Sequence, residues 1–383
     1  MRICLVYDCL FPHTVGGAER WYRNLAERLS AAGHDVTYLT LRQWDRREAP
    51  TVAGVKVRTV GPQMALYAAP GRRRVLPPIV FGAGVLWHLL RNGRDYDVVH
   101  TGSFPYFSVL GASVARVLHR YRIVVDWHEV WTKEYWREYL GRAGGRVGWM
   151  IQRICAGVPQ QAFCFSDLHA RRLKSIGVRG SVTVLRGEFG GPSPRREPLP
   201  ADPVVLFAGR HINEKRVEAL VPAVMVARAQ IPALTGIAFG DGPTRPRVLA
   251  TIRESQAEGI VLAPGFVSSE ELAEKLASAL CMLLPSRREG YGLIVVEAAA
   301  MGVPSIVVRG DDNAATELIA EGENGTIAQS AEPDELAMAI VRIYDGGEGM
   351  RAATLAWYHR NAASLSLSGS LNQVVQTYGG ARG

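Results

Sequence analysis

Short apolar runs rich in valine and isoleucine alternate with longer helical patterns along almost the whole chain. In the first half, the runs that we predict as strands are Arg2–Tyr7, Val36–Thr40, Val98–His100, Ile123–Asp126, Ala162–Ser166 and Val182–Leu185. Such alternation is typical of a parallel sheet covered by helices, because each helix carries the chain back to begin the next strand. The pattern therefore predicts a doubly wound α/β fold.

The alternation stops once and then begins again. After Arg186 the chain becomes rich in glycine, proline and charged residues as far as Pro203, a composition typical of a linker. The second series of predicted strands is Val204–Ala208, Leu234–Phe239, Ile260–Leu262, Cys281–Leu284 and Ser305–Val308. A single hydrophobic core seldom extends over 383 residues. We therefore predict two Rossmann-like domains that face a cleft.

The predicted boundaries follow from these changes in pattern. The N-terminal domain spans residues 1–188, the linker 189–203 and the C-terminal domain 204–350. The last segment, 351–383, has helical patterns and is predicted to cross back to the first domain.

Charge is divided unevenly between the two halves. Residues 1–200 hold 29 Lys and Arg against 15 Asp and Glu, a net charge of +14, whereas residues 201–383 carry −6. A basic half indicates an anionic partner. Nucleic acid is not the predicted partner, because the basic residues are dispersed and form no recognised binding motif. An anionic acceptor molecule or an anionic membrane surface is the alternative that this charge supports.

Two apolar features bear on the membrane alternative. The stretch Val75–Leu90 is shorter than the roughly 20 apolar residues of a spanning helix. We interpret it as a buried or half-buried helix, with contact to a membrane surface as the other interpretation. Trp131, Tyr135 and Tyr139 recur at helical spacing, which suits either a core face or a surface for lipid headgroups.

The five cysteines are far apart in the sequence and include no CxxC pair. This spacing disfavours a disulfide framework or a zinc site and favours a reducing compartment. We predict a cytoplasmic location, with peripheral attachment to the inner face of the cell membrane as an option.

Parallel sheets bind ligands at the carboxyl ends of their strands, so the loops after the strands carry the candidate site. The first predicted strand is followed by Gly16 and Gly17, directly before a helix. Glycines there let a ligand approach the backbone, and the helix N-terminus presents free N–H groups to an anion. The dinucleotide fingerprint GxGxxG is absent, which disfavours NAD or FAD.

The second half opens with two cations in one loop. Arg210 and Lys215 follow the strand Val204–Ala208. A planar guanidinium and a compact ammonium can neutralise different oxygens of a diphosphate. A solvated loop with scattered charges is the alternative.

The most specific segment runs from Leu284 to Ala298, where a strand leads through a glycine loop into a helix. Free N–H groups near Gly292 and Leu293 can hold a phosphate. Glu289 in the loop can bind hydroxyl groups beside that phosphate. Glu297 lies in an apolar stretch where an unpaired carboxylate would be costly, and it can reach a ribose diol.

In this order the motifs resemble those of the retaining glycosyltransferases of family GT4, which have the GT-B fold. The matching motifs are Gly16-Gly17-Ala18-Glu19, Gly209-Arg210 with Lys215, Gly240-Asp241-Gly242-Pro243, and Glu289 with Glu297 followed by Ala298–Pro304. The resemblance extends over nearly the whole chain. It implies a metal-independent transfer of a sugar from a nucleotide-sugar donor to a hydroxyl acceptor. The candidate acceptors are a glycan, a lipid-linked saccharide and a glycolipid precursor.

The resemblance also implies roles for the residues of the second domain. Arg210 and Lys215 would bind the diphosphate of the donor. Glu297 would hold the nucleotide ribose, and Glu289 the hydroxyl groups of the donor sugar.

Further positions match with less detail. His128 takes the place of a family histidine that contacts the donor sugar near the anomeric carbon. Phe266 and Val267 take the place of the loop that contacts the base. The chain departs from the family at Arg216, where many members carry glycine.

Two other functions stay open at this point. A nucleotide-sugar epimerase with the same fold would share the donor half and need no acceptor, and an inactive GT-B protein would act as a scaffold. No cofactor and no metal are expected. Asp95 and Asp97 have the spacing of a metal-binding DxD, but they begin an apolar run that favours a strand. The base, the sugar, the acceptor and the oligomeric state are left open.

Overall fold

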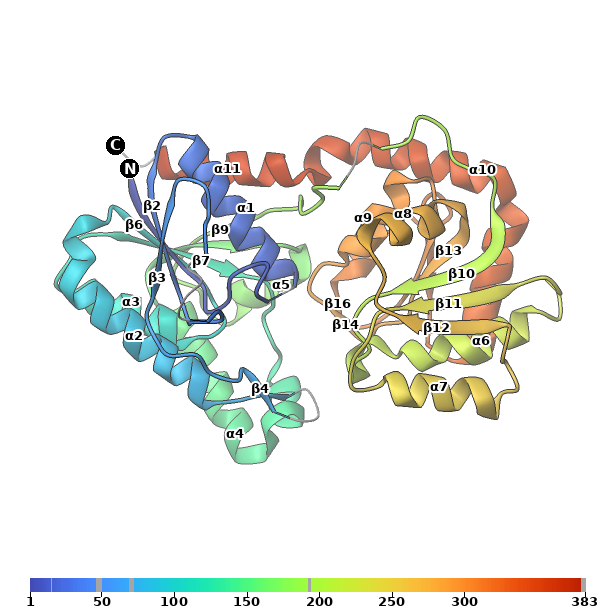
Figure 1. Cartoon of the computed structure of the whole chain (residues 1–383), viewed down its shortest axis with the longest axis horizontal. Coiled ribbons are helices and arrows are strands. Elements are labelled where there is room, and N and C mark those ends of the chain that lie inside the picture. Colours follow the sequence, from blue (N-terminus) through green and yellow to red (C-terminus); the bar gives the residue numbers. More distant parts are fainter. Residues whose placement is uncertain (15, 46–49, 69–71, 192–193, 380–383) are drawn as a thin grey trace. The chain divides into compact units, whose positions relative to one another are not determined.

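The computed structural model describes the chain except for residues 15, 46–49, 69–71, 192–193 and 380–383. The excluded residues include part of the predicted linker and the end of the predicted C-terminal segment. The chain folds into two compact units, each with its own sheet (Figure 1). Unit 1 comprises Met1–Arg186 and the segment that begins at Ser368, and unit 2 comprises Gly187–Leu367.

Unit 1 contains a seven-stranded sheet in which all neighbouring strands are parallel. Its order is β3 (Val55–Thr59), β2 (Asp35–Thr40), β1 (Arg2–Val6), β6 (Val98–Gly102), β7 (Arg122–Trp127), β8 (Gln160–Cys164) and β9 (Gly180–Val184). The direction of winding reverses between β1 and β6. In sheets of this kind ligands bind at the carboxyl ends of the strands beside such a reversal.

The helices of unit 1 cover its sheet. They are α1 (Gly17–Ala31), α2 (Leu76–Asn92), α3 (Phe107–Ala115), α4 (Lys133–Ala156), α5 (Asp167–Ser175) and α11 (Leu367–Gly379). In α1, Trp21, Leu25 and Leu29 are buried, as their helical spacing predicts. The strands β4 (Tyr67–Ala68) and β5 (Arg72–Arg73) form a small antiparallel hairpin before α2.

Unit 2 contains a six-stranded parallel sheet. Its order is β12 (Val261–Gly265), β11 (Thr235–Phe239), β10 (Asp202–Ala208), β13 (Ala279–Leu284), β15 (Ser305–Val308) and β17 (Gly325–Ala328). The winding reverses between β10 and β13. The helices are α6 (Leu220–Ala227), α7 (Arg245–Glu254), α8 (Ser269–Ser278), α9 (Leu293–Ala300) and α10 (Pro333–Leu365). Two short strands, β14 (Arg288–Glu289) after β13 and β16 (Asp312–Asn313) after β15, pair with each other in parallel. The two sheets confirm the predicted doubly wound α/β class.

The chain returns to unit 1 at a later residue than the sequence pattern suggested. We expected the return to the first domain at residue 351, but Arg351 lies in α10 and belongs to unit 2. Its buried guanidinium donates hydrogen bonds to the Ala277 and Ala279 carbonyls at 2.7 and 2.6 Å. The segment from Ser368 on belongs to unit 1, where the Arg122 guanidinium donates to the Tyr378 carbonyl at 2.6 Å.

The aromatic side chains at the start of α4 differ from the predicted helical face. Thr132 caps α4 through its side chain, so Trp131 precedes the helix that carries Tyr135 and Tyr139. The three rings still touch, with centroids of Trp131 4.8 Å from Tyr135 and 5.1 Å from Tyr139. Trp131 is half-buried and Tyr135 is buried, so the cluster joins the core to the surface.

Candidate active site

The loops after β10 and β13 of unit 2 carry the cations and carboxylates singled out by sequence. The two loops are joined by the Arg287 amide, which donates to the Glu214 carbonyl at 2.8 Å. The Lys215 ammonium forms an ion pair with the Glu289 carboxylate, and the Ser286 hydroxyl donates to the same Glu289 oxygen at 2.7 Å. The structure therefore brings Lys215 and Glu289 together beside the reversal of winding in unit 2.

Arg210 is exposed just after the end of β10. There the loop after β10 and the loop after β11 lie in close backbone contact. Gly240 has a φ of 111°, and a Cβ there would lie 2.0 Å from the Gly209 carbonyl oxygen. Only glycine fits this approach. The Gly240-Asp241-Gly242-Pro243 motif therefore holds the loop after β11 against the loop that bears Arg210.

Arg216 shows why glycine suits the position after Lys215. Its backbone is left-handed, with φ 47° and ψ 43°. Its Nε donates to the Pro285 carbonyl at 2.7 Å, which ties it to the loop after β13. Burial and the nearby Arg287 lower the pKa of the Arg216 guanidinium below its ordinary value. The departure from the family pattern thus adds a positive charge at the junction of the two loops.

Replacing Arg216 separates the backbone strain from the side-chain contact. Arg216→Ala and Arg216→Gly both lose the hydrogen bond to Pro285, but only glycine relieves the left-handed backbone. We expect the glycine variant to be more stable than the alanine variant by about 1 kcal/mol. Urea unfolding followed by circular dichroism measures the difference. Equal stability of the two variants would contradict the strain.

The N-terminus of α9 lies at the end of the same loop. Gly292 precedes the helix in a left-handed conformation, with φ 104°, and a Cβ there would lie 2.7 Å from the Ala315 Cβ. The helix begins at Leu293 and carries the half-buried Glu297. Phe266, directly after β12, has 75% of its surface exposed, and Val267 is half-buried.

Asn313 supports the loop after β13, although no sequence motif points to it. Its buried side-chain amide donates to the Ser286 carbonyl at 3.1 Å and to the Val308 carbonyl at 2.8 Å. It therefore ties the loop before Glu289 to the end of β15. Such a role depends on contacts distant in sequence, which no local pattern reveals.

In unit 1, His128 follows β7 directly. Its ring stacks on Phe165, with centroids 4.3 Å apart, and meets the edge of Tyr22 at 6.3 Å. Burial lowers the pKa of His128, although Asp126 and Glu129 act in the opposite direction. Its Nε2 is buried and makes no hydrogen bond. His128 is therefore a neutral, positioned imidazole at neutral pH.

Asp126 forms the centre of a buried network behind His128. It is fully buried and accepts hydrogen bonds from the Trp21 indole at 2.8 Å and from the His100 ring at 2.7 Å. The other ring nitrogen of His100 contacts the Tyr378 hydroxyl of α11. The network therefore joins α1, β6, β7 and α11.

The glycine motif after β1 lies where the sequence placed it. α1 begins at Gly17, and Gly16 precedes it with an extended backbone. The carboxylate of Glu19 lies in the first turn and is largely buried. A negative charge in that turn is stabilised by the helix dipole, so Glu19 already complements the N-terminus that we predicted for an anion.

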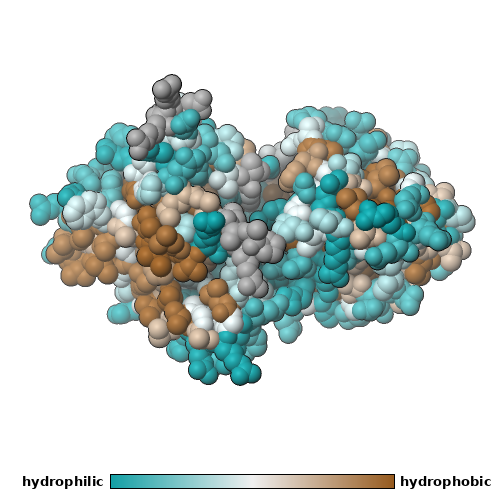
Figure 2. Space-filling view, turned by 60° about the horizontal axis from the view of Figure 1, so that its bottom comes forward, coloured by the Kyte–Doolittle hydropathy of each residue, from teal (hydrophilic) through white to brown (hydrophobic). Residues whose placement is uncertain are grey.

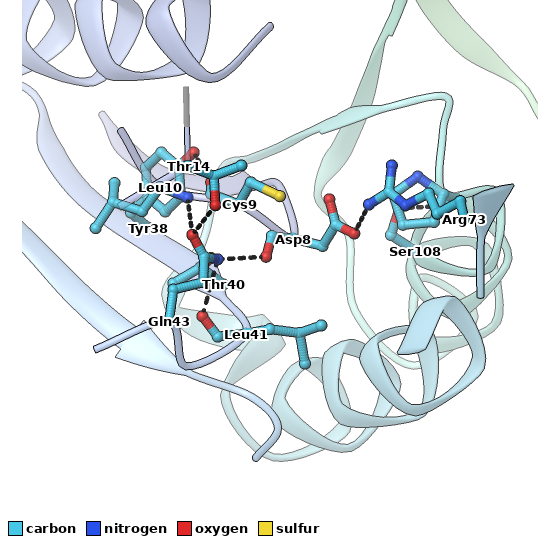
Figure 3. A network of polar contacts seen from close by, with 11 residues as sticks. Asp8, Cys9, Leu10, Thr14, Tyr38, Thr40, Leu41, Gln43, Arg73 and Ser108 are labelled. Carbon is cyan, nitrogen blue, oxygen red and sulfur yellow. Dashed lines mark hydrogen bonds and ion pairs between the residues drawn. The ribbon is translucent and has the colours of Figure 1, made fainter. Parts of the chain in front are cut away.

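A buried ion pair in the same loop was missed by sequence reasoning. Asp8 follows β1 by two residues, is fully buried, and pairs with Arg73 of the β4–β5 hairpin (Figure 3). Nothing in the local pattern links two residues so far apart.

Among the described residues, no group of histidine, cysteine and carboxylate side chains is arranged to hold a metal ion. Asp97 precedes β6 at its amino end and accepts hydrogen bonds from Arg2, through the backbone amide at 2.8 Å and the guanidinium at 3.3 Å. Asp97 of the DxD spacing therefore makes a structural contact.

Comparison with protein families matches both units. Residues 15–186 match the family described as Glycosyltransferase Family 4. Residues 202–346 match the family described as Glycosyl transferases group 1. Together the two matches cover most of the chain.

Among curated proteins, an α-D-kanosaminyltransferase of Streptomyces kanamyceticus is 29% identical over 46% of this chain and 45% of its own length. The MMP α-(1→4)-mannosyltransferase of Mycolicibacterium hassiacum is 27% identical over 92% of this chain and 91% of its own length. The chain thus spans under half of the first relative and nearly all of the second.

Among solved structures, sucrose-phosphate synthase from Thermosynechococcus elongatus aligns with a TM-score of 0.77 at 21% identity, covering 98% of both chains. Anabaena Alr3699/HepE in complex with UDP-glucose aligns with a TM-score of 0.71 at 17% identity, covering 99% of both chains. At these identities the structures establish the GT-B fold.

Proposed function

Because the chain belongs to the GT4 glycosyltransferases, which transfer a sugar from a nucleotide-sugar donor, we propose that it moves a hexose to a hydroxyl group of a saccharide or glycolipid acceptor. The donor half of the proposal rests on unit 2. The acceptor half rests on unit 1, whose exposed surface suits contact with an anionic membrane.

The Lys215–Glu289 ion pair is the observation that carries the donor assignment. In the free protein the two charges neutralise each other, and Ser286 satisfies the same carboxylate. A bound diphosphate would attract the Lys215 ammonium and leave Glu289 to accept hydrogen bonds from sugar hydroxyls. A UDP-hexose is a suitable first probe, because the structure of HepE contains UDP-glucose.

The chemistry needs charge stabilisation at the leaving group. When the bond between the anomeric carbon and the phosphate oxygen breaks, negative charge develops on the diphosphate. We assign its stabilisation to Arg210, Lys215 and the N–H groups at the start of α9. Lys215 and the start of α9 have fixed positions in the ligand-free protein, whereas Arg210 is exposed. For His128 we propose contact with the donor sugar, in line with its neutral imidazole.

Glu297→Ala tests the donor site. If Glu297 holds the nucleotide ribose, the variant is expected to bind the donor roughly 10- to 100-fold more weakly, since hydrogen bonds to a charged group are lost. Isothermal titration with UDP-glucose, GDP-mannose and ADP-glucose measures this. Glu270→Ala, which removes an exposed carboxylate of α8, is the matched control.

Turnover separates the candidate functions. Release of nucleotide that increases with added saccharide acceptors supports transfer. Conversion of the sugar without nucleotide release would favour an epimerase, and tight donor binding without any turnover would favour a scaffold.

Helix α2 supports a location at a membrane surface. Its inner face buries Pro77, Phe81 and Val85, yet its outer face is also apolar, with Leu76 and Trp87 each 60% exposed. An ordinary surface helix carries polar residues on its outer face. Among the described residues, no helix combines the length and apolar character needed to cross a bilayer.

Neighbouring elements extend this surface, which Figure 2 shows as brown areas on unit 1. We define the apolar face of unit 1 by its exposed residues Leu76, Ile79, Trp87, Val114, Val117 and Leu118. Exposed arginines accompany it at positions 74, 91, 94 and 120. Apolar contact combined with basic charge suits an anionic bilayer, and we propose such a bilayer as the occupant.

Vesicle flotation tests this face. With phosphatidylcholine vesicles containing 30% phosphatidylglycerol, we expect the protein to float at low salt and less at high salt. The triple variant Ile79→Ser, Val117→Ser, Leu118→Ser should remain at the bottom of the gradient. The control replaces exposed apolar residues of unit 2, Leu262→Ser and Met338→Ser, and should float. Failure of the native protein to float would refute the bilayer contact.

A further inference from the structure

The reversal of winding in unit 1 lies between β1 and β6. The loops that follow β1, β6 and β7 begin beside it, and each carries a side chain of different chemistry. Asp8 follows β1, Phe104 follows β6 and His128 follows β7. Because the strands are parallel and adjacent, these residues share the carboxyl edge of the sheet. The equivalent edge of unit 2 holds the Lys215–Glu289 pair.

The Asp8 carboxylate is only half satisfied. One oxygen pairs with the Arg73 guanidinium, whereas Oδ1 is buried and makes no hydrogen bond. Leaving an ionised acceptor unsatisfied away from water is costly, and such a group in a native structure requires an explanation. A ligand hydroxyl that donates to Oδ1 would supply the missing bond.

The backbone around Asp8 is held in place by one glutamine (Figure 3). The Gln43 amide donates to the Asp8 carbonyl at 2.7 Å. Its oxygen accepts from the Leu10 amide at 2.9 Å and from the Thr14 hydroxyl at 2.8 Å. The carboxylate is therefore presented by a preorganised loop rather than by a free one.

Aromatic rings lie beside this ion pair. The Arg73 guanidinium lies over the Phe104 ring, 4.9 Å from its centroid. Phe104 in turn stacks with Trp131, at 6.0 Å between centroids and an interplanar angle of 27°. Both rings are half-buried, so each keeps part of its surface accessible. Flat apolar rings next to a few fixed polar groups are typical of a small-molecule site.

The local charge favours a neutral ligand over an anionic one. Burial raises the pKa of the neighbouring Tyr7 phenol well above its ordinary value, and the nearby Glu19 and Asp8 carboxylates raise it further. The Asp8 and Glu19 carboxylates thus lie near this edge, and the Arg73 guanidinium acts on the pKa of Tyr7 in the opposite direction. A second anion would be repelled, whereas hydroxyl groups can donate to the carboxylates.

We propose that this edge of unit 1 is a saccharide subsite, in which Asp8 accepts a hydrogen bond from a ring hydroxyl and Phe104 and Trp131 stack on the apolar face of a neutral sugar. The inference rests on the proposed glycosyl transfer, since it names the acceptor as a neutral saccharide ring. Any anionic portion of the acceptor binds outside this subsite, toward the exposed arginines at positions 74, 91, 94 and 120.

Saturation-transfer NMR tests the subsite without a donor sugar. The probes are the methyl α-glycosides of glucose, mannose and galactose, with glucose 6-phosphate as the anionic probe, each with and without UDP. We expect saturation transfer to at least one neutral glycoside. The signal should fall at least fivefold in Asp8→Asn and in Trp131→Leu.

Asp35→Asn is the matched control. Asp35 also pairs with a cation, Lys56 at 2.8 Å, but the pair is exposed and lies at the amino end of β2. This variant should keep the native signal. If Asp8→Asn does not fold, Trp131→Leu decides the question.

Two outcomes would overturn the proposal. One is no transfer to any neutral glycoside in the native protein, whether or not glucose 6-phosphate gives a signal, and the other is an undiminished signal in both variants. Donor binding distinguishes this failure from failure of the proposed function. Asp8→Asn should bind the nucleotide sugar as tightly as the native protein, whereas Glu297→Ala should not.

Discussion

Replacing Lys215 with alanine is expected to lower kcat by about 10²- to 10³-fold, the loss typical of removing one preorganised stabiliser of a developing negative charge. The Lys215 ammonium is held by Glu289 between the loops after β10 and β13. In the proposed function the ammonium turns to the diphosphate when the donor binds, so it is already in place when charge develops on the departing diphosphate. Steady-state release of nucleotide measures the effect, with whichever of UDP-glucose, GDP-mannose and ADP-glucose the native protein binds most tightly.

The matched control is Lys275→Ala, which removes an exposed lysine of α8 in the same unit. Its kcat should remain within about twofold of the native value. A loss confined to KM in Lys215→Ala, with kcat unchanged, would contradict the role at the leaving group, because it would indicate uniform binding of donor and transition state.

The elements of the fold that sequence predicts well are those with strong apolar patterns. Ser305–Val308 was predicted with its observed bounds, and the strand at Val204 was placed within two residues of its start at Asp202. The strand β3 was missed, because its residues are mostly exposed and its apolar signal is weak. The strand β17 was missed because its four residues include a single large apolar one, Ile327, so its apolar signal is weak.

In the candidate site, too, sequence identifies the residues with a distinctive local pattern but not the contacts between distant segments. Sequence identified Lys215 and Glu289, since each lies in a loop whose composition is distinctive. It could not reveal that they pair, nor that Asn313 anchors their loop, because these contacts depend on the order of strands in the sheet. The ion pair between Asp8 and Arg73 could not be predicted from sequence for the same reason.

Arg216 illustrates a departure that sequence could detect but not explain. A non-glycine residue at that position was evident, yet its consequence depended on the backbone. The left-handed φ of 47° and the bond to Pro285 show that the loop keeps the conformation that glycine would adopt easily. The charge of Arg216 is therefore carried on a left-handed backbone that glycine also adopts.

Replacing Asp126 with alanine is expected to destabilise unit 1 by about 3–5 kcal/mol, the cost of breaking a buried, hydrogen-bonded charge network. The indole of Trp21 and the ring of His100 would each lose an acceptor at a fully buried site. Seven of the eight tryptophans lie in residues 1–186, so urea unfolding followed by tryptophan fluorescence reports mainly on unit 1. Asp97→Ala, which breaks an exposed pair with Arg2, should cost no more than about 1 kcal/mol.

The pH dependence of this loss provides a second, independent check. Burial by itself would raise the pKa of Asp126, but His100 and the hydrogen bonds from His100 and Trp21 hold it below the ordinary value of 3.8. The unfolded chain therefore takes up a proton at higher pH than the folded one, and the carboxylate stabilises the fold fully only above that value. The difference in unfolding free energy between native protein and Asp126→Asn should be constant near neutral pH and shrink as the pH falls below 3.8. A difference that instead grew on acidification would mean that the buried carboxyl group is protonated in the folded state, and that the network is held by its hydrogen bonds without the charge.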